Sequence, residues 1–122
     1  PATKGVEFGA GFASAAMKGS ECNDEILDKK GTTATNNSGG INGGITNGNS
    51  LLFRVAVKPA SSIKVIKKTV NMKTGERSDI SVKGRHDACI ALRAPVVVEA
   101  AAAIALADLM LLEHKVPRVL KG

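Results

Sequence analysis

The chain has 122 residues, a length that suits a single domain spanning 1–122, and its 43% hydrophobic content excludes disorder throughout. A formal net charge of +6 at pH 7 indicates an anionic partner: a phosphate ester, a polycarboxylate, a nucleic acid or a membrane surface. Only 2% of the residues are aromatic, all of them Phe, whereas binders of single-stranded nucleic acid stack bases on several aromatic side chains. We therefore expect no nucleic-acid partner.

The first thirty residues predict one strand and two short helical segments. Apolar residues alternate over residues 3–9, which is typical of a strand. The Ala-rich stretch 12–18 favours a helix that stops at Gly19, and residues 24–30 suggest one further helical turn.

Residues 9–14, GAGFAS, follow the first strand and nearly match the G-x-G-x-x-G pattern of dinucleotide-binding domains. Ser14 stands in place of the third glycine, and the later strands are expected to be antiparallel. We therefore favour glycines that serve a turn.

Residues 31–50, GTTATNNSGGINGGITNGNS, contain almost nothing that a core could bury. A loop of this length inside a compact domain is either functional or a flexible linker, and composition leaves both readings open. The glycines would allow backbone N–H groups to approach a phosphate or the edge of a flavin.

Period-two alternation returns after this segment. It predicts a strand over residues 53–57, ended by Pro59, and a second strand over 63–72 with a bulge where the alternation changes phase. The sequence Lys-Thr-Gly-Glu at 73–76 predicts a hairpin turn, and residues 80–82 continue the return strand. Together with the first strand these segments predict an antiparallel four-stranded sheet with helices packed on it, an α+β fold.

Residues 95–113 predict a helix that begins at a proline and is apolar nearly all round. The run is long enough to cross a membrane, but Glu99 and Asp108 argue against a span, and we expect no membrane partner. Such a helix should be covered on several sides, by a second copy of the chain or by a further part of the protein.

The two cysteines, Cys22 and Cys89, fit neither a disulfide framework nor a metal-binding spacing, so we expect no metal site. The first residues carry no basic and apolar leader pattern. Both features favour a reducing, cytoplasmic setting.

Four blocks of the sequence resemble the chorismate synthase family and follow one another in the family's order. They are VEFGAGFASAAMKGSECND (6–24), NNSGGINGGITNGN (36–49), RVAVKPASSI (54–63) and GRHDACIALRAPVVVEA (84–100). The resemblance implies that the chain corresponds to a C-terminal fragment, about a third of a family member. It also implies half of a β-α-β sandwich of antiparallel sheets and a homo-oligomer, usually a tetramer.

The resemblance further implies an activity. Family members convert 5-enolpyruvylshikimate 3-phosphate to chorismate and phosphate by a 1,4-anti elimination that requires reduced FMN. The family's two catalytic histidines belong to the portion that this chain does not match, so we expect the chain alone to be inactive. A non-catalytic oligomerisation or anion-binding module that keeps the family scaffold is the alternative.

The matching blocks also imply roles for individual residues. Asp87 corresponds to the acid that assists proton abstraction, and Arg85 to a guanidinium at both substrate and flavin, where its forked donors suit oxygen pairs. Ala88 stands where the family commonly has proline. The positions that correspond to flavin contacts are Asn23, Ser38, Gly39, Gly40, Lys58, Ser62, Arg85 and His86.

Overall fold

The computed structural model describes residues 2–86 and 89–117. Asp87, to which the resemblance gives the role of the acid, and Ala88, which stands where the family commonly has proline, lie outside the described residues. The chain divides into two compact units, one up to Lys58 and one from Pro59 onward.

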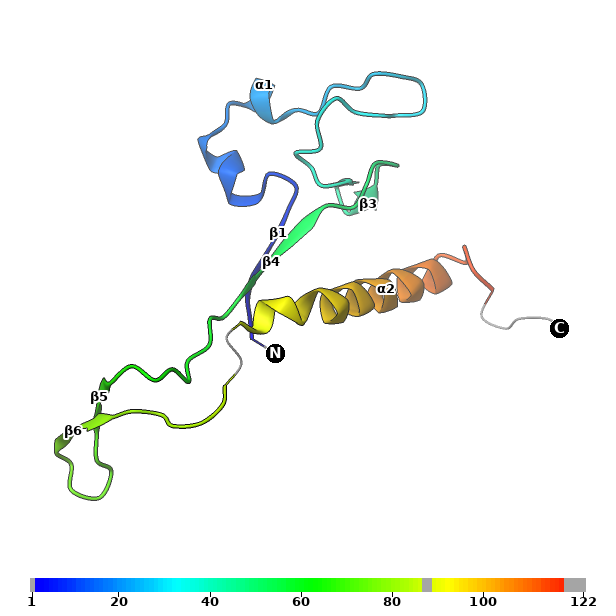
Figure 1. Cartoon of the computed structure of the whole chain (residues 1–122). Helices are drawn as coiled ribbons and strands as arrows, with labels where there is room; N and C mark the ends of the chain where they lie inside the picture. Colours follow the sequence, from blue (N-terminus) through cyan, green and yellow to red (C-terminus); the bar gives the residue numbers. More distant parts are fainter. Residues whose placement is uncertain (1, 87–88, 118–122) are drawn as a thin grey trace. The chain divides into compact units, whose positions relative to one another are not determined.

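An antiparallel strand pair forms the centre of the first unit. Strand β1 (Thr3–Phe8) lies beside β4 (Phe53–Val57), as Figure 1 shows. Phe8 faces Phe53 across the pair with ring centroids 5.8 Å apart. Both strands were predicted from alternation, and their pairing joins apolar side chains with apolar ones on one face, which stabilises this register.

The segment between these strands differs from its prediction. A 3-10 helix, η1 (Gly11–Ala16), replaces the expected helix over 12–18, and α1 (Gly19–Cys22) begins at the glycine that was expected to end one. The helical turn expected over 24–30 is wrong: Ile26 forms an isolated bridge with Thr33. The helical turn is absent because the Asp28 carboxylate accepts hydrogen bonds from the backbone N–H groups of Lys30 and Thr32, and these bonds compete with helical ones.

The Gly/Asn-rich segment 31–50 is ordered around a small hairpin. Strand β2 (Ile41–Asn42) pairs with β3 (Ile45–Thr46), and the two residues between them, Gly43 and Gly44, have φ of +57° and +81°. Positive φ at both central positions is what the favoured two-residue hairpin turn requires.

Three glycines are the buried residues of the first unit's described part: Gly9, Gly39 and Gly40. The Gly9 N–H donates to Leu52 O (2.9 Å), and the Leu52 N–H donates to Gly39 O (3.0 Å). A Cβ atom on Gly39, where φ is +67°, would lie 2.5 Å from Gly9 N and 2.6 Å from Leu52 O. The close approach of these backbones therefore requires glycine at position 39.

The second unit contains the predicted hairpin. Strand β5 (Lys67–Val70) pairs with β6 (Arg77–Ile80), and Gly75 adopts positive φ (+74°) in the connecting turn. The strand expected over 63–72 begins only at Lys67, so the bulge expected at the change of phase is not formed.

The expected four-stranded sheet is not formed by the residues described. Three separate two-stranded sheets take its place, β1–β4, β2–β3 and β5–β6. The β1–β4 ladder ends at the pair Thr3 and Val57, followed by a hydrogen bond from the Lys58 N–H to the Ala2 carbonyl. Pro59, the second residue after β4, lacks an N–H group and cannot donate to extend the ladder. The mixture of antiparallel strands and helices still agrees with an α+β fold.

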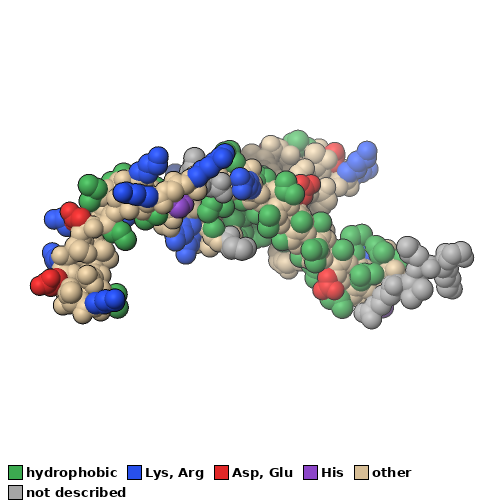
Figure 2. Space-filling view, turned by 60° about the horizontal axis from the view of Figure 1, so that its bottom comes forward, with side chains coloured by type: hydrophobic (Ala, Val, Ile, Leu, Met, Phe, Trp, Pro, Cys, Tyr) green, Lys and Arg blue, Asp and Glu red, His purple; other side chains and the backbone are tan. Residues whose placement is uncertain are grey.

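The long helix α2 (Ala94–Leu112) matches its predicted range to within one residue and follows a 3-10 turn, η2 (Ile90–Leu92). Pro95 lies at its start, where a missing N–H costs nothing. Hydrophobic side chains reach the surface over much of the face in Figure 2, and within α2 Val96 and Ile104 are 73% and 71% exposed.

Among the described residues α2 is long and apolar enough to cross a membrane, a test that the core helix of a soluble protein also passes. No hydrophobic side chain in the described part of either unit is buried. The cover that the sequence predicts for this helix is therefore not supplied by the described residues of its own unit.

Candidate functional site

The Asp24 carboxylate fixes the loop that precedes the buried glycines. Its Oδ1 accepts hydrogen bonds from the Thr35 hydroxyl (2.7 Å) and the Asn37 N–H (2.7 Å), and its Oδ2 accepts one from the Ser38 N–H (2.9 Å). One side chain thus joins the end of the α1 segment to three positions of the 35–38 loop.

Electrostatics agrees with this geometry. Partial burial alone would raise the pKa of Asp24, but the hydrogen bonds from the Thr35 side chain, the Ser38 and Asn37 N–H groups and the Ser38 side chain outweigh it and lower the pKa to about 2. The carboxylate is therefore ionised at neutral pH, with its oxygens directed at donors of the loop.

A chain of side-chain amides leads to Ser38 from the other side. Asn49 Nδ2 donates to Asn47 Oδ1 (3.1 Å), Asn47 Nδ2 donates to Asn42 Oδ1 (2.6 Å), and Asn42 Nδ2 donates to Ser38 Oγ (3.1 Å). Asn49 also donates to the Gly31 carbonyl (3.0 Å), which ties the two ends of the loop together. Within the series from Asn49 to Ser38, each amide donates to the next residue in the direction of Ser38.

These groups surround a cavity of about 670 Å³, a size typical of small-molecule sites. Its lining residues are Cys22, Asn23, Asp24, Glu25, Ile26, Gly31, Thr33, Ser38, Asn42, Asn47 and Asn49. The wall is rich in amide and hydroxyl groups, which can donate to or accept from the heteroatoms of a polar ring. No group of three or more metal-ligating side chains occurs in the described ranges.

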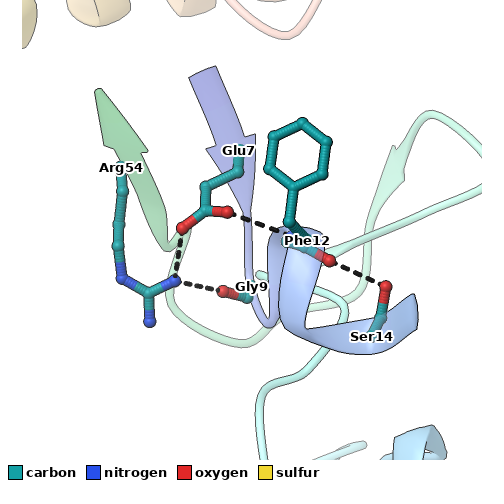
Figure 3. A network of polar contacts seen from close by, with 6 residues as sticks. Glu7, Gly9, Phe12, Ser14 and Arg54 are labelled. Carbon is teal, nitrogen blue, oxygen red and sulfur yellow. Dashed lines mark hydrogen bonds and ion pairs between the residues drawn. The ribbon is translucent and has the colours of Figure 1, made fainter. Parts of the chain in front are cut away.

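A second polar network supports the turn at Gly9 (Figure 3). Glu7 Oε2 accepts from the Phe12 N–H (3.0 Å), and Glu7 Oε1 pairs with Arg54 at 3.1 Å, while Arg54 also donates to the Gly9 carbonyl (2.8 Å). The Phe12 N–H and then Arg54 lower the pKa of Glu7. The clamp formed by Glu7 and Arg54 holds the backbone that contacts Gly39.

The structure brings together part of the predicted site. Asn23 and Ser38 line the same cavity, although they are separated by the turn that contains Asp28. Gly39 and Gly40 follow Ser38 directly and are buried against the backbone of Gly9, Leu52 and Ser50, so they shape the loop rather than line the cavity.

Lys58 is not among the residues that line this cavity. Lys58 ends the first unit, and its N–H donates to the Ala2 carbonyl (2.7 Å). Ser62, Arg85 and His86 belong to the second unit, where Ser62 is half-buried and the other two are exposed. Asp87 is outside the described residues.

Sequence reasoning missed Asp24 and the three asparagines Asn42, Asn47 and Asn49. The available signal was weak: an acidic residue next to Asn23, and a segment with many amides whose bonding partners depend on how the loop folds. Only the folded loop reveals that these side chains share one network with Ser38.

Comparison with known proteins gives one consistent result. A protein from Chitinophaga pinensis is 66% identical over 122 residues, covering all of this chain and 37% of the relative. A protein from Archaeoglobus fulgidus is 53% identical, covering 98% of the chain and 34% of the relative, and one from Dehalococcoides mccartyi is 50% identical over 99% of the chain.

All three relatives carry the name chorismate synthase. This chain spans about a third of their length. The family description "Chorismate synthase" matches residues 1–111, which include the cavity, the hairpin and most of α2. The chain belongs to the chorismate synthase family.

Proposed function

We propose that this chain forms part of a chorismate synthase, a lyase that converts 5-enolpyruvylshikimate 3-phosphate to chorismate and phosphate with reduced FMN. Family membership over residues 1–111 carries the proposal. The polar cavity adds support, since two of the positions that correspond to flavin contacts, Asn23 and Ser38, line it together.

The residues of the cavity fit one edge of a flavin. Amide and hydroxyl groups at Asn23, Ser38 and Asn42 can donate to and accept from ring heteroatoms, and the cavity is large enough for a ring system. When bound, reduced FMN would supply electron density to the substrate and assist removal of the ring hydrogen. In this proposal, the residues of this chain bind and orient the edge of the flavin ring.

Arg85 and Asp87 take the charged roles in this proposal. The Arg85 guanidinium binds oxygen pairs of the anionic substrate, because its forked N–H groups match carboxylate and phosphate geometry. Asp87 assists abstraction of the ring proton, working with the flavin. Lys58, Ser62 and His86 contribute further flavin contacts. We also assign the protein to the cytoplasm and to a homo-oligomer.

The test is a chimera in which this chain replaces the matching third of the Chitinophaga pinensis relative. We expect phosphate release from 5-enolpyruvylshikimate 3-phosphate with reduced FMN, and a loss of about a hundredfold or more on Asp87→Asn, in the range of general acid–base effects. The chain alone should give no turnover. A chimera that folds and binds substrate but releases no phosphate would contradict the proposal.

The alternative, a non-catalytic oligomerisation module, has one observation in its favour: the exposed apolar surface of α2. It predicts a monodisperse oligomer of the chain in light scattering together with no turnover in the chimera. Turnover by the chimera would favour the enzyme over the oligomerisation module, because a module that only associates would not restore phosphate release.

A further inference from the structure

We infer that Asp24 is a positioning residue of the candidate flavin site: its carboxylate fixes the 35–38 loop and thereby sets where Ser38 lies in the cavity. The inference rests on the proposed function, because it takes the cavity as the place where the flavin edge binds. It adds a residue that the family resemblance does not assign.

The first support is the number and direction of the bonds. Asp24 accepts from Thr35, Asn37 and Ser38, at 2.7–2.9 Å, so both carboxylate oxygens are used by one short loop. Hydrogen bonds to a charged acceptor are roughly twice as strong as neutral ones. We therefore expect the Asp24 carboxylate to determine the conformation of the 35–38 loop.

The second support is the amide chain on the opposite side of Ser38. The Ser38 hydroxyl oxygen accepts from Asn42, and the Ser38 N–H is taken by Asp24. Ser38 is thus held at two atoms by two different segments. Since Asn42, Asn47 and Asn49 donate in one direction, the chain of donors ends beside a negative charge, which favours this arrangement over its reverse.

The same unit also contains a second carboxylate, Asp28, that can serve as a control for Asp24. Asp28 also accepts from backbone N–H groups, those of Lys30 (2.8 Å) and Thr32 (3.1 Å), and the Thr32 N–H lowers its pKa most. It does not line the cavity and none of its bonds reaches the 35–38 loop. Asp28 therefore separates loss of a loop anchor in general from loss of the anchor at Ser38.

The experiment compares Asp24→Asn with Asp28→Asn in the chimera. In Asp24→Asn an NH₂ group replaces one acceptor oxygen and faces backbone donors, so we expect faster hydrogen exchange at Asn37 and Ser38 and FMN affinity about tenfold weaker. Asp28→Asn should speed exchange at Lys30 and Thr32 and leave FMN affinity within about twofold, as expected for a site without a shared partner.

A milder variant covers the case in which Asp24→Asn fails to fold. Thr35→Val removes one of the three bonds at nearly constant shape, and we expect FMN affinity about threefold weaker, less than for Asp24→Asn, because the backbone bonds remain. Asp24→Glu keeps the charge and should restore part of the affinity that Asp24→Asn loses.

The outcomes separate the two proposals. FMN affinity unchanged in both Asp24→Asn and Thr35→Val, with exchange at Ser38 accelerated, would overturn the positioning role while turnover by the chimera still supports the enzyme. Equal losses in Asp24→Asn and Asp28→Asn would also overturn it. FMN binding that depends on Asp24 in a chimera without turnover would support the positioning role and contradict the proposed activity.

Discussion

The two units of this chain are held together in different ways. In the first, up to Lys58, side-chain carboxylates and amides bond to loop backbone, and glycines let three backbone segments meet around Gly39. In the second, a hairpin is followed by a 19-residue helix, most of whose large apolar side chains are exposed.

The difference shows which interactions determine the conformation of each unit. The first unit specifies its loops through side-chain hydrogen bonds to residues 11 to 47 positions away in the sequence, and these bonds form without a large core. The second unit carries hydrophobic surface that its own described residues do not cover, and such surface is stable only when something covers it. The first unit should therefore respond to single atoms at its loops, and the second to changes in what covers α2.

The largest effect is expected at Gly39. In Gly39→Ala a Cβ would lie 2.5 Å from Gly9 N and 2.6 Å from Leu52 O, at a backbone φ of +67°. Neither backbone segment can yield easily, so we expect local stability to fall by about 3–5 kcal/mol. Hydrogen exchange at Leu52, whose N–H donates to Gly39 O, measures it in the chimera.

Gly43→Ala is the matched control for that substitution. Gly43 also has positive φ (+57°), but nothing lies within 4 Å of an added Cβ. Only backbone strain remains, about 1–2 kcal/mol. Equal losses in the two variants would show that the close approach around Gly39 contributes nothing.

The next effect is expected on α2 in the chain alone. Val97 and Ile104 are 60% and 71% exposed and lie seven residues apart, on one face of the helix. Replacing both with Gln removes apolar area without breaking the helix, so self-association should weaken by about 3 kcal/mol, on the order of a hundredfold. The concentration dependence of the mass in light scattering measures it.

Met72→Gln serves as the control for the helix variant. Met72 is 93% exposed but lies in the turn between β5 and β6. Association should not change, because a single exposed side chain in a turn offers no continuous apolar face. An equal loss of association would mean that α2 is not the surface involved.

These contrasts also explain what the sequence could predict. Alternation located β1 and β4, the Lys-Thr-Gly-Glu sequence located the hairpin turn, and the apolar run beginning at Pro95 located α2. Each of these signals is local. The four-stranded sheet is not formed by the described residues, because alternation says which residues share a face but not which strands pair.

Some residues of the candidate site could also be predicted from the sequence, and others could not. Asn23 and Ser38 came from the resemblance to the family, and they share the cavity. The anchor at Asp24 could not be found from spacing, because only the folded loop brings residues 35–38 to it. The helical turn expected over 24–30 failed for the related reason that Asp28 bonds to nearby backbone N–H groups.

A smaller effect is expected when the first unit is acidified. The pKa of Asp24 is lowered to about 2 from its ordinary 3.8 by the loop's hydrogen bonds, which outweigh the opposing effect of burial. The folded form therefore binds its proton less readily than the unfolded form, and the stabilisation is complete above the ordinary pKa. Protection of the Asn37 and Ser38 amides should fall as pH drops from 4 toward 2.

The Asp24→Asn variant provides the comparison for this titration. It has no carboxylate at position 24, so protection at Ser38 should start lower and change less over the same pH range. Protection factors remove the intrinsic pH dependence of exchange, so the two proteins can be compared directly. A wild-type profile that stays flat down to pH 2 would contradict the anchoring role of the charge.

The smallest effect is expected at the clamp of Glu7 and Arg54. Arg54 is 57% exposed in its side chain, and solvent screens such pairs strongly. Glu7→Gln keeps an oxygen that can accept from the Phe12 N–H but removes the charge that attracts Arg54. Protection of the Phe12 amide should fall only about twofold, because exposed ion pairs contribute little.

Salt dependence distinguishes the charge from the hydrogen bond at this clamp. In the wild type, protection of the Phe12 amide should decrease slightly as ionic strength rises, because screening weakens the attraction between Glu7 and Arg54. In Glu7→Gln it should not respond to salt, since only a neutral hydrogen bond remains. A variant that responds to salt as strongly as the wild type would show that the ion pair does not hold the turn, and that the hydrogen bond from Arg54 to the Gly9 carbonyl suffices.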